Sequence, residues 1–276
     1  MEKKRRLYPV QYRAESWISK VFLVLTALVV LTGLVSRSNK TSFSMEHIPE
    51  PTTLPMDARF DETLTTMQLE LQPKMWYALQ MGVFDSKDAA QKSAEAFQRR
   101  GAAGYLWLDG RYRVLAAVYP EKEDAQNVRT QLAEQHGIDS YLYVINFPAM
   151  LLQLSGKQGQ LEIIQSAFDM LDEIAVELQR LSVALDRGEV SVQEIIQSIA
   201  KQDETVQTVA LRIKQRFEKP YHQTANVFIE HFEAFALFTE NAAEIQNAAD
   251  MGLKLKQQTF ATLQMIQTTY QTLDKT

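Results

Sequence analysis

Hydrophobic and polar positions follow the same order twice within residues 76–145. In each copy an alternating stretch comes first, then a helical pattern, then a second, short alternating stretch. Alternation with a period of two predicts a strand, and apolar residues three or four positions apart predict a helix. The expected strands are residues 76–84, 105–108, 112–119 and 141–145. We therefore predict an α+β fold, in which two strand–helix–strand units form a four-stranded antiparallel sheet under two helices.

Alternation also assigns the side chains of this predicted sheet to two faces. One face carries aliphatic residues such as Leu79 and Val114, which match apolar positions of the predicted helices. The other face carries aromatic and hydrogen-bonding side chains: Trp76, Gln80, Tyr105, Trp107, Arg113, Tyr141 and Tyr143. An open face is normally polar, so this mixture favours sugar binding, in which rings cover C–H patches and polar groups meet hydroxyls. Two alternatives remain: these residues are ordinary strand formers, or the C-terminal part of the chain covers this face.

The N-terminal segment has the pattern of a membrane anchor. Residues 1–20 are basic, and an apolar run follows at 21–35. With the apolar residues before it, the run approaches the roughly 17–25 residues that cross a bilayer. The preceding positive charges predict a single pass with a cytoplasmic N-terminus and an extracytoplasmic C-terminus. A cleaved signal peptide is the alternative, although the exit from the run lacks a small-x-small cleavage pattern.

The segment after the apolar run predicts a tether. Residues 36–73 contain four prolines and show no sustained period. Such a composition is typical of a disordered linker that would hold the next domain away from the membrane. Within this linker, residues 61–71 could form a short helix.

Residues 157–276 show helical periodicity, which predicts an all-α bundle domain. Gly188 is placed to end a first helix, and Ser191 with Glu194 forms a capping box for a second. A third helical stretch is longer and could break at Gly252. Short turns between such helices favour antiparallel packing, so we expect a three-helix bundle.

The third helical stretch contains a broad apolar cluster. Its members are Phe228, Phe232, Phe235, Leu237 and Phe238. Together they cover more of the helix surface than a single apolar stripe would. They form either the core of the bundle or a docking face for a partner protein or a second copy of this chain.

Composition argues against several classes of function. A net charge of −5 does not suit a nucleic-acid-binding protein. The absence of cysteine excludes disulfides, thiolate zinc sites and cysteine nucleophiles. His222 and His231 lack a third ligand at metal-site spacing. Asp169, Asp172 and Glu173 lie on one predicted helix, not across a cleft as glycoside hydrolysis requires. We expect no enzyme activity, no metal and no cofactor.

The doubled segment resembles the SPOR domain, a repeat module of bacterial division and sporulation proteins. The family's usual opening, Tyr-x-Val-Gln-x-Gly-Ser-Phe, is similar to residues 77–84. Its usual third strand, Tyr-Arg-Val-Arg-Val-Gly-Pro-Phe, is similar to residues 112–119. The resemblance implies that residues 74–147 form a SPOR-type βαββαβ domain. It also implies binding to septal peptidoglycan glycan strands that have lost their stem peptides.

Gln80 and Arg113 occupy the family's glutamine and its first third-strand arginine, whereas Val83 and Leu115 replace a serine and an arginine. The residues expected to bind glycan are Trp76, Gln80, Tyr105, Trp107 and Arg113. The order of anchor, module and helical tail resembles the stage II sporulation protein B group, which implies a role in septal remodelling and engulfment. Two alternatives are a vegetative division protein that promotes septal wall synthesis and a wall hydrolase with a SPOR targeting arm.

Overall fold

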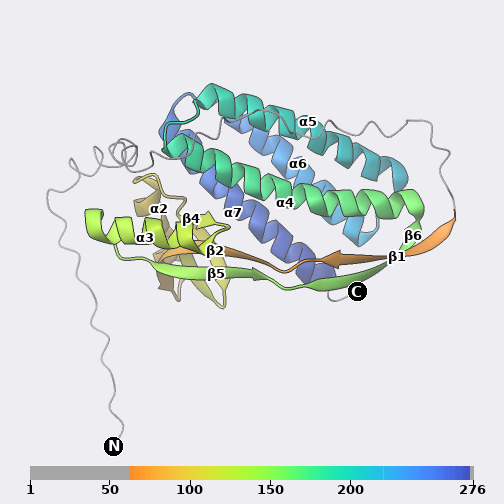
Figure 1. Ribbon diagram of the computed structural model, residues 1–276, viewed down its shortest axis with the longest axis horizontal. Coiled ribbons are helices and arrows are strands. Elements are labelled where there is room, and N and C mark those ends of the chain that lie inside the picture. The colour runs from red at the N-terminus through yellow and green to blue at the C-terminus, as the bar shows by residue number, and fades with distance from the viewer. Residues whose placement is uncertain (1–62, 220, 274–276) are drawn as a thin grey trace, which may run out of the picture.

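The computed structural model describes residues 63–219 and 221–273. This part of the chain is an α+β fold with six helices and two antiparallel sheets (Figure 1). The elements are β1 Leu64–Leu71, β2 Lys74–Phe84, α2 Lys87–Gln98, β3 Tyr105–Asp109, β4 Arg111–Tyr119, α3 Lys122–His136, β5 Tyr141–Phe147, β6 Met150–Lys157, α4 Gln158–Asp186, α5 Val192–Arg216, α6 Gln223–Ala243 and α7 Ala248–Leu273.

The expected membrane span and most of the expected linker lie outside the described residues. Among the helices that the structure describes, none is long and apolar enough to cross a bilayer.

The doubled pattern forms the predicted four-stranded sheet. Its strand order is β3-β4-β2-β5, with antiparallel pairing throughout. Helix α2 begins where the Ser86 hydroxyl accepts a hydrogen bond from the amide of Ala89, at 3.2 Å. Ala90 and Ala94 of α2 pack on Val114 in a small core between helix and sheet. Helix α3 packs on β2, β4 and β5, so the prediction of an α+β fold with two helices on a four-stranded antiparallel sheet is confirmed.

Residues 64–71 form strand β1, so the prediction of a linker or a short helix there is wrong. Strand β1 pairs with β6 along its whole length, from Leu64 opposite Lys157 to Leu71 opposite Met150. Alternate residues of this two-stranded ribbon are buried, among them Leu69 and Leu152. A half-buried ribbon needs a period of two, which a helix cannot supply.

The β1–β6 ribbon continues the β2–β5 pair, as the long ribbon of Figure 1 shows. Pro73 lies between β1 and β2, and Pro148 lies between β5 and β6. Proline has no N–H to donate to a ladder, so a proline on each arm interrupts the pairing at one point. The continuation carries the chain directly into α4, which packs on both β1 and β6.

The C-terminal region contains four described helices rather than the three expected. The long third stretch breaks between Ala243 and Ala248, not at Gly252, which is buried inside α7. The side-chain oxygen Oδ1 of Asn247 accepts a hydrogen bond from the backbone amide of Asp250 at 2.9 Å, which caps a new helix at this point. The Ser191–Glu194 capping box is confirmed.

The apolar cluster of α6 belongs to the core. Phe228, Phe232, Phe235 and Phe238 are all buried, whereas Leu237 is exposed. Phe228 also meets Phe168 of α4 edge-on, with ring centroids 4.9 Å apart. The cluster therefore joins helices of the bundle, and the core interpretation is the one that the structure supports.

Candidate functional site

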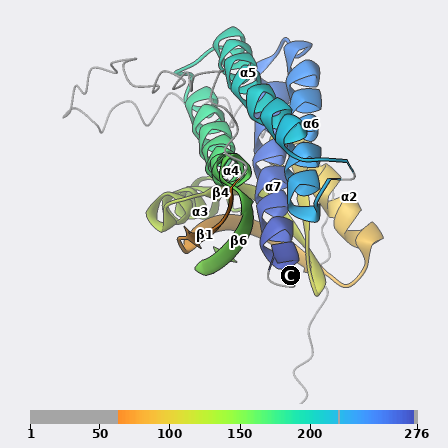
Figure 2. The ribbon, with the colours of Figure 1, turned by 90° about the vertical axis from the view of Figure 1, so that its right-hand side faces the viewer.

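The second face of the four-stranded sheet is covered by the helical bundle. Helix α7 packs on β4, and α4 and α7 lie next to the strands in both views (Figures 1 and 2). Trp76 and Trp107 are only 5% and 1% exposed, and Leu115 is fully buried. All three belong to one continuous core with the buried residues of the bundle. The prediction of an open aromatic face is wrong, and the covering by the C-terminal region is the alternative that holds.

Tyr105 is part of this covered interface. Its ring stacks on Phe260 of α7, with centroids 5.3 Å apart, and its hydroxyl donates a hydrogen bond to Gln264 at 2.5 Å. Burial raises the pKa of Tyr105 to about 12. Nearby, the ring of Phe147 meets Tyr270 edge-on at 5.8 Å. Tyr105, one of the aromatic residues that favoured sugar stacking, therefore stacks on the bundle instead.

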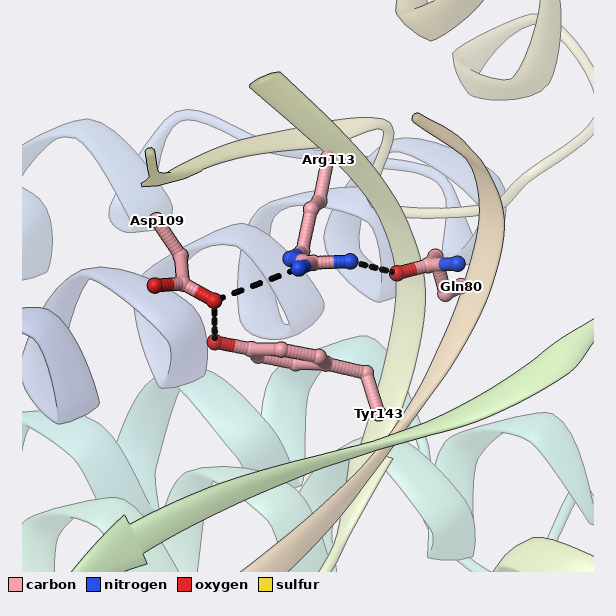
Figure 3. A network of polar contacts seen from close by, with 4 residues as sticks. All are labelled: Gln80, Asp109, Arg113 and Tyr143. Atoms are coloured by element: carbon pink, nitrogen blue, oxygen red, sulfur yellow. Dashed lines mark hydrogen bonds and ion pairs between the residues drawn. The ribbon is translucent and has the colours of Figure 1, made fainter. Parts of the chain in front are cut away.

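One corner of the same face stays accessible, and it contains Gln80 and Arg113. We call Gln80, Asp109, Arg113 and Tyr143 the polar corner (Figure 3). Each of the four sheet strands supplies one of these residues: β2, β3, β4 and β5 in that order. The corner therefore crosses the sheet, and its geometry depends on the register of all four strands.

Arg113 is the centre of the polar corner. Its guanidinium donates to the Gln80 side-chain oxygen at 2.7 Å and to the Asp109 carboxylate at 3.3 Å. It also lies over the Tyr143 ring, 4.6 Å from the centroid. The Arg113 Nε atom is buried and has no hydrogen-bond partner among the described residues. The side chain as a whole is 23% exposed, so ligand can reach part of the guanidinium.

The Tyr143 hydroxyl completes the network by donating to the Asp109 carboxylate at 3.0 Å. Burial is the main cause of a raised pKa for the Tyr143 phenol, and this hydrogen bond raises the pKa further. Beside it, Tyr141 pairs with Gln80 in the sheet register and is 68% exposed. An accessible ring therefore stands next to fixed amide, guanidinium and hydroxyl groups.

Local backbone features explain how the corner forms. The hairpin turns at Gly110, whose φ of 65° favours glycine, and pairs Asp109 with Arg111. That turn places Asp109 beside Arg113. On β2 the register with β4 shifts on both sides of Gln80, and such irregularities re-aim side chains.

Sequence reasoning identified Gln80 and Arg113 but did not single out Asp109. The available signal was the Asp109-Gly110 pair between two short strands, which is a strong hairpin pattern. Tyr143 was assigned to the correct face but not to the expected binding set. Of that set, the structure brings Gln80 and Arg113 together and places Trp76, Tyr105 and Trp107 under the bundle.

The polar corner suits the hydroxyl-rich part of a ligand better than a charged group. Asp109 already balances the charge of Arg113, so a free anion would gain little from the guanidinium. Amide, guanidinium and phenol groups offer both donors and acceptors in fixed positions. The exposed Tyr141 ring can cover an apolar sugar face.

The histidines and the acidic cluster have structural contacts. His222 accepts a hydrogen bond from the Thr224 amide at the start of α6, and His231 bonds to Thr269 at 3.1 Å. Asp172 pairs with Lys74, which links α4 to β2. Burial and the neighbouring carboxylate of Asp172 raise the pKa of Asp169.

No grouping of three or more metal-binding side chains occurs in the described part of the chain. In comparisons with known proteins, no family model, no curated protein and no solved structure matches this chain.

Proposed function

We propose that this chain is a non-enzymatic peptidoglycan-binding protein. Residues 21–35 anchor it in the membrane, and the part from residue 63 onward lies outside and holds glycan strands that have lost their stem peptides. The polar corner is the contact site, with Tyr141 as the stacking platform. Its setting is the division or sporulation septum, where such strands would localise the protein and assist wall remodelling.

One observation carries this proposal. Gln80 and Arg113, the two expected glycan-binding residues that match the SPOR pattern, are hydrogen-bonded to each other at 2.7 Å on an accessible part of an otherwise covered face. A fixed amide–guanidinium pair beside the exposed ring of Tyr141 is chemistry that sugars require. Because Trp76 and Trp107 are buried, the proposal does not use them as contacts.

Co-sedimentation of the full chain with purified wall sacculi tests the proposal. We expect pelleting with sacculi from which an amidase has removed the stem peptides, and much less with untreated sacculi. Gln80→Ala should weaken binding roughly fivefold, as the loss of one hydrogen bond predicts. The matched control is Gln68→Ala, since Gln68 is an exposed residue of β1.

If Gln80→Ala and Gln68→Ala bind the sacculi equally well, the polar corner is not part of the glycan-binding site. Absence of pelleting with either kind of sacculus would refute glycan binding. A zymogram with the same protein tests the alternative that the chain is a wall hydrolase, because a zone of wall digestion would show that it is an enzyme.

A further inference from the structure

A cleft of about 370 Å³ lies where the sheet module (β2–β5 with α2 and α3) meets the bundle (α4–α7), and none of its lining residues belongs to the polar corner. Such a volume is within the range of small-ligand sites, roughly 300–1,000 Å³. Helix α2 supplies Gln91 and Gln98, α7 supplies Lys254, Gln257 and Gln258, and the start of β3 supplies Tyr105. The cleft therefore exists only when module and bundle are packed together.

Two of these glutamines, Gln98 and Gln257, are held by hydrogen bonds to the backbone just before β3. The Gln98 amide nitrogen donates to the carbonyl of Gly104 at 3.3 Å, and that of Gln257 donates to the carbonyl of Ala103 at 3.1 Å. Each amide keeps a second N–H and a carbonyl oxygen with which it can meet a ligand. Because the amides are already held in place, less side-chain conformational entropy is lost when a ligand binds.

Gly104 lets the start of β3 approach α2 closely on one side of the cleft. Its φ is +53°, and a Cβ there would lie 2.5 Å from the carbonyl oxygen of Ala94 in α2. Only glycine fits such an approach. Tyr105, the next residue, is held by its stacking on Phe260, so its ring is a fixed part of the cleft.

The lining has a definite chemical character. Four carboxamides, one tyrosine and one lysine contribute its polar groups, and none of the described residues that line it is acidic. Side-chain amides present a donor and an acceptor side by side, which matches neighbouring hydroxyl or acetamido groups of a sugar. Lys254 is exposed and adds a positive charge for a carboxylate. A cationic ligand would find no counter-charge among these residues.

We infer that this cleft is a second carbohydrate subsite, which takes a short, acidic amino-sugar segment of a glycan strand. The inference rests on the proposed function in taking glycan as the ligand. Gln257 and Gln258 bind hydroxyl or acetamido groups, and Lys254 binds the sugar carboxylate. Two separate contacts on one strand would raise the effective concentration of glycan at each.

Calorimetric titration of the full chain tests this inference with two soluble probes. One is a peptide-free oligosaccharide of alternating N-acetylglucosamine and N-acetylmuramic acid, and the other is a chitin oligosaccharide of the same length, which lacks the carboxylate. Gln258→Leu should weaken both probes roughly fivefold. Lys254→Met should weaken only the acidic probe, by about two- to fivefold. Gln267→Leu, on the same helix but outside the cleft, should leave both affinities unchanged.

The outcomes separate the two proposals. If the wild type binds, Gln80→Ala weakens binding and both cleft variants behave like the wild type, the subsite is refuted while the proposed function stands. If the wild type binds neither probe, the proposed function fails and the subsite fails with it. If Gln258→Leu weakens binding and Gln80→Ala does not, the cleft replaces the polar corner as the site.

Discussion

Arg113 is held by partners that come from three other strands. Gln80 and Asp109 accept hydrogen bonds from its guanidinium nitrogens, and its guanidinium carbon lies over the ring of Tyr143. The planar guanidinium can serve all three partners at once because its donors point in fixed directions. An arginine in such a position links strands of the sheet as well as presenting a ligand contact.

Arg113→Lys should therefore destabilise the protein by about 1–3 kcal/mol, because an ammonium cannot reproduce the two-sided hydrogen bonding and leaves the half-buried Gln80 side-chain oxygen without its partner. The matched control is Arg111→Lys on the same strand. Arg111 pairs with Asp85 at 2.7 Å, but both side chains are largely exposed, so we expect a change of less than about 0.5 kcal/mol. Denaturant unfolding measures both, and equal losses would contradict a special role for Arg113.

At the scale of elements, the sheet module shares its core with the bundle. Trp76, Trp107 and Leu115 lie on the module, yet their burial depends on α4 and α7. The core on the opposite side, under α2, is smaller: its buried members are Ala90, Ala94 and Val114, and the larger apolar residues around them are only partly buried. The larger share of the module's apolar burial is thus on its bundle side.

A fragment of residues 74–147 should therefore fail to fold cooperatively. Exposing Trp76, Trp107 and Leu115 costs roughly 5–9 kcal/mol, which is comparable to the whole stability of a small domain, about 5–15 kcal/mol. We expect the fragment to bind a hydrophobic dye and to melt without a sharp transition, whereas residues 63–273 should unfold in one step. A well-folded fragment would show that the module is an independent domain.

The elements also show what can be predicted from sequence. The four strands and two helices of the doubled pattern were predictable because each has a clear period and a turn or cap at its end, such as Ser86. Strand β1 was missed, although Met67, Leu69 and Leu71 alternate, because its partner β6 is far away in sequence and also unrecognised. The break at Asn247 was missed because an asparagine cap is a weaker signal than the glycine at 252.

Part of the candidate site was predictable for a similar reason. Gln80 and Arg113 were identifiable from a local motif, whereas the burial of Trp107 depends on a core shared with helices much later in the chain. Tyr105 and its partner Gln264, for example, are separated by 159 residues. A pattern of apolar residues predicts that a face is buried or binds something, but it does not name the partner.

At the scale of the whole molecule, α7 connects the two candidate sites. It covers the aromatic part of the sheet face, leaves the polar corner accessible and forms one wall of the amide-lined cleft. Its packing therefore decides which parts of the sheet face a ligand can reach. In this account the bundle stays in place when glycan binds.

Hydrogen exchange of the full chain, with and without peptide-free glycan, tests this central claim most directly. We predict slower exchange around Gln80, Arg113 and Tyr143 when glycan is present. Peptides that contain Trp76, Trp107 or α7 should remain protected to the same degree or more. Faster exchange in α7 on glycan addition would show that the bundle lifts to expose the aromatic face, and unchanged exchange at the polar corner would show that the corner is not the site.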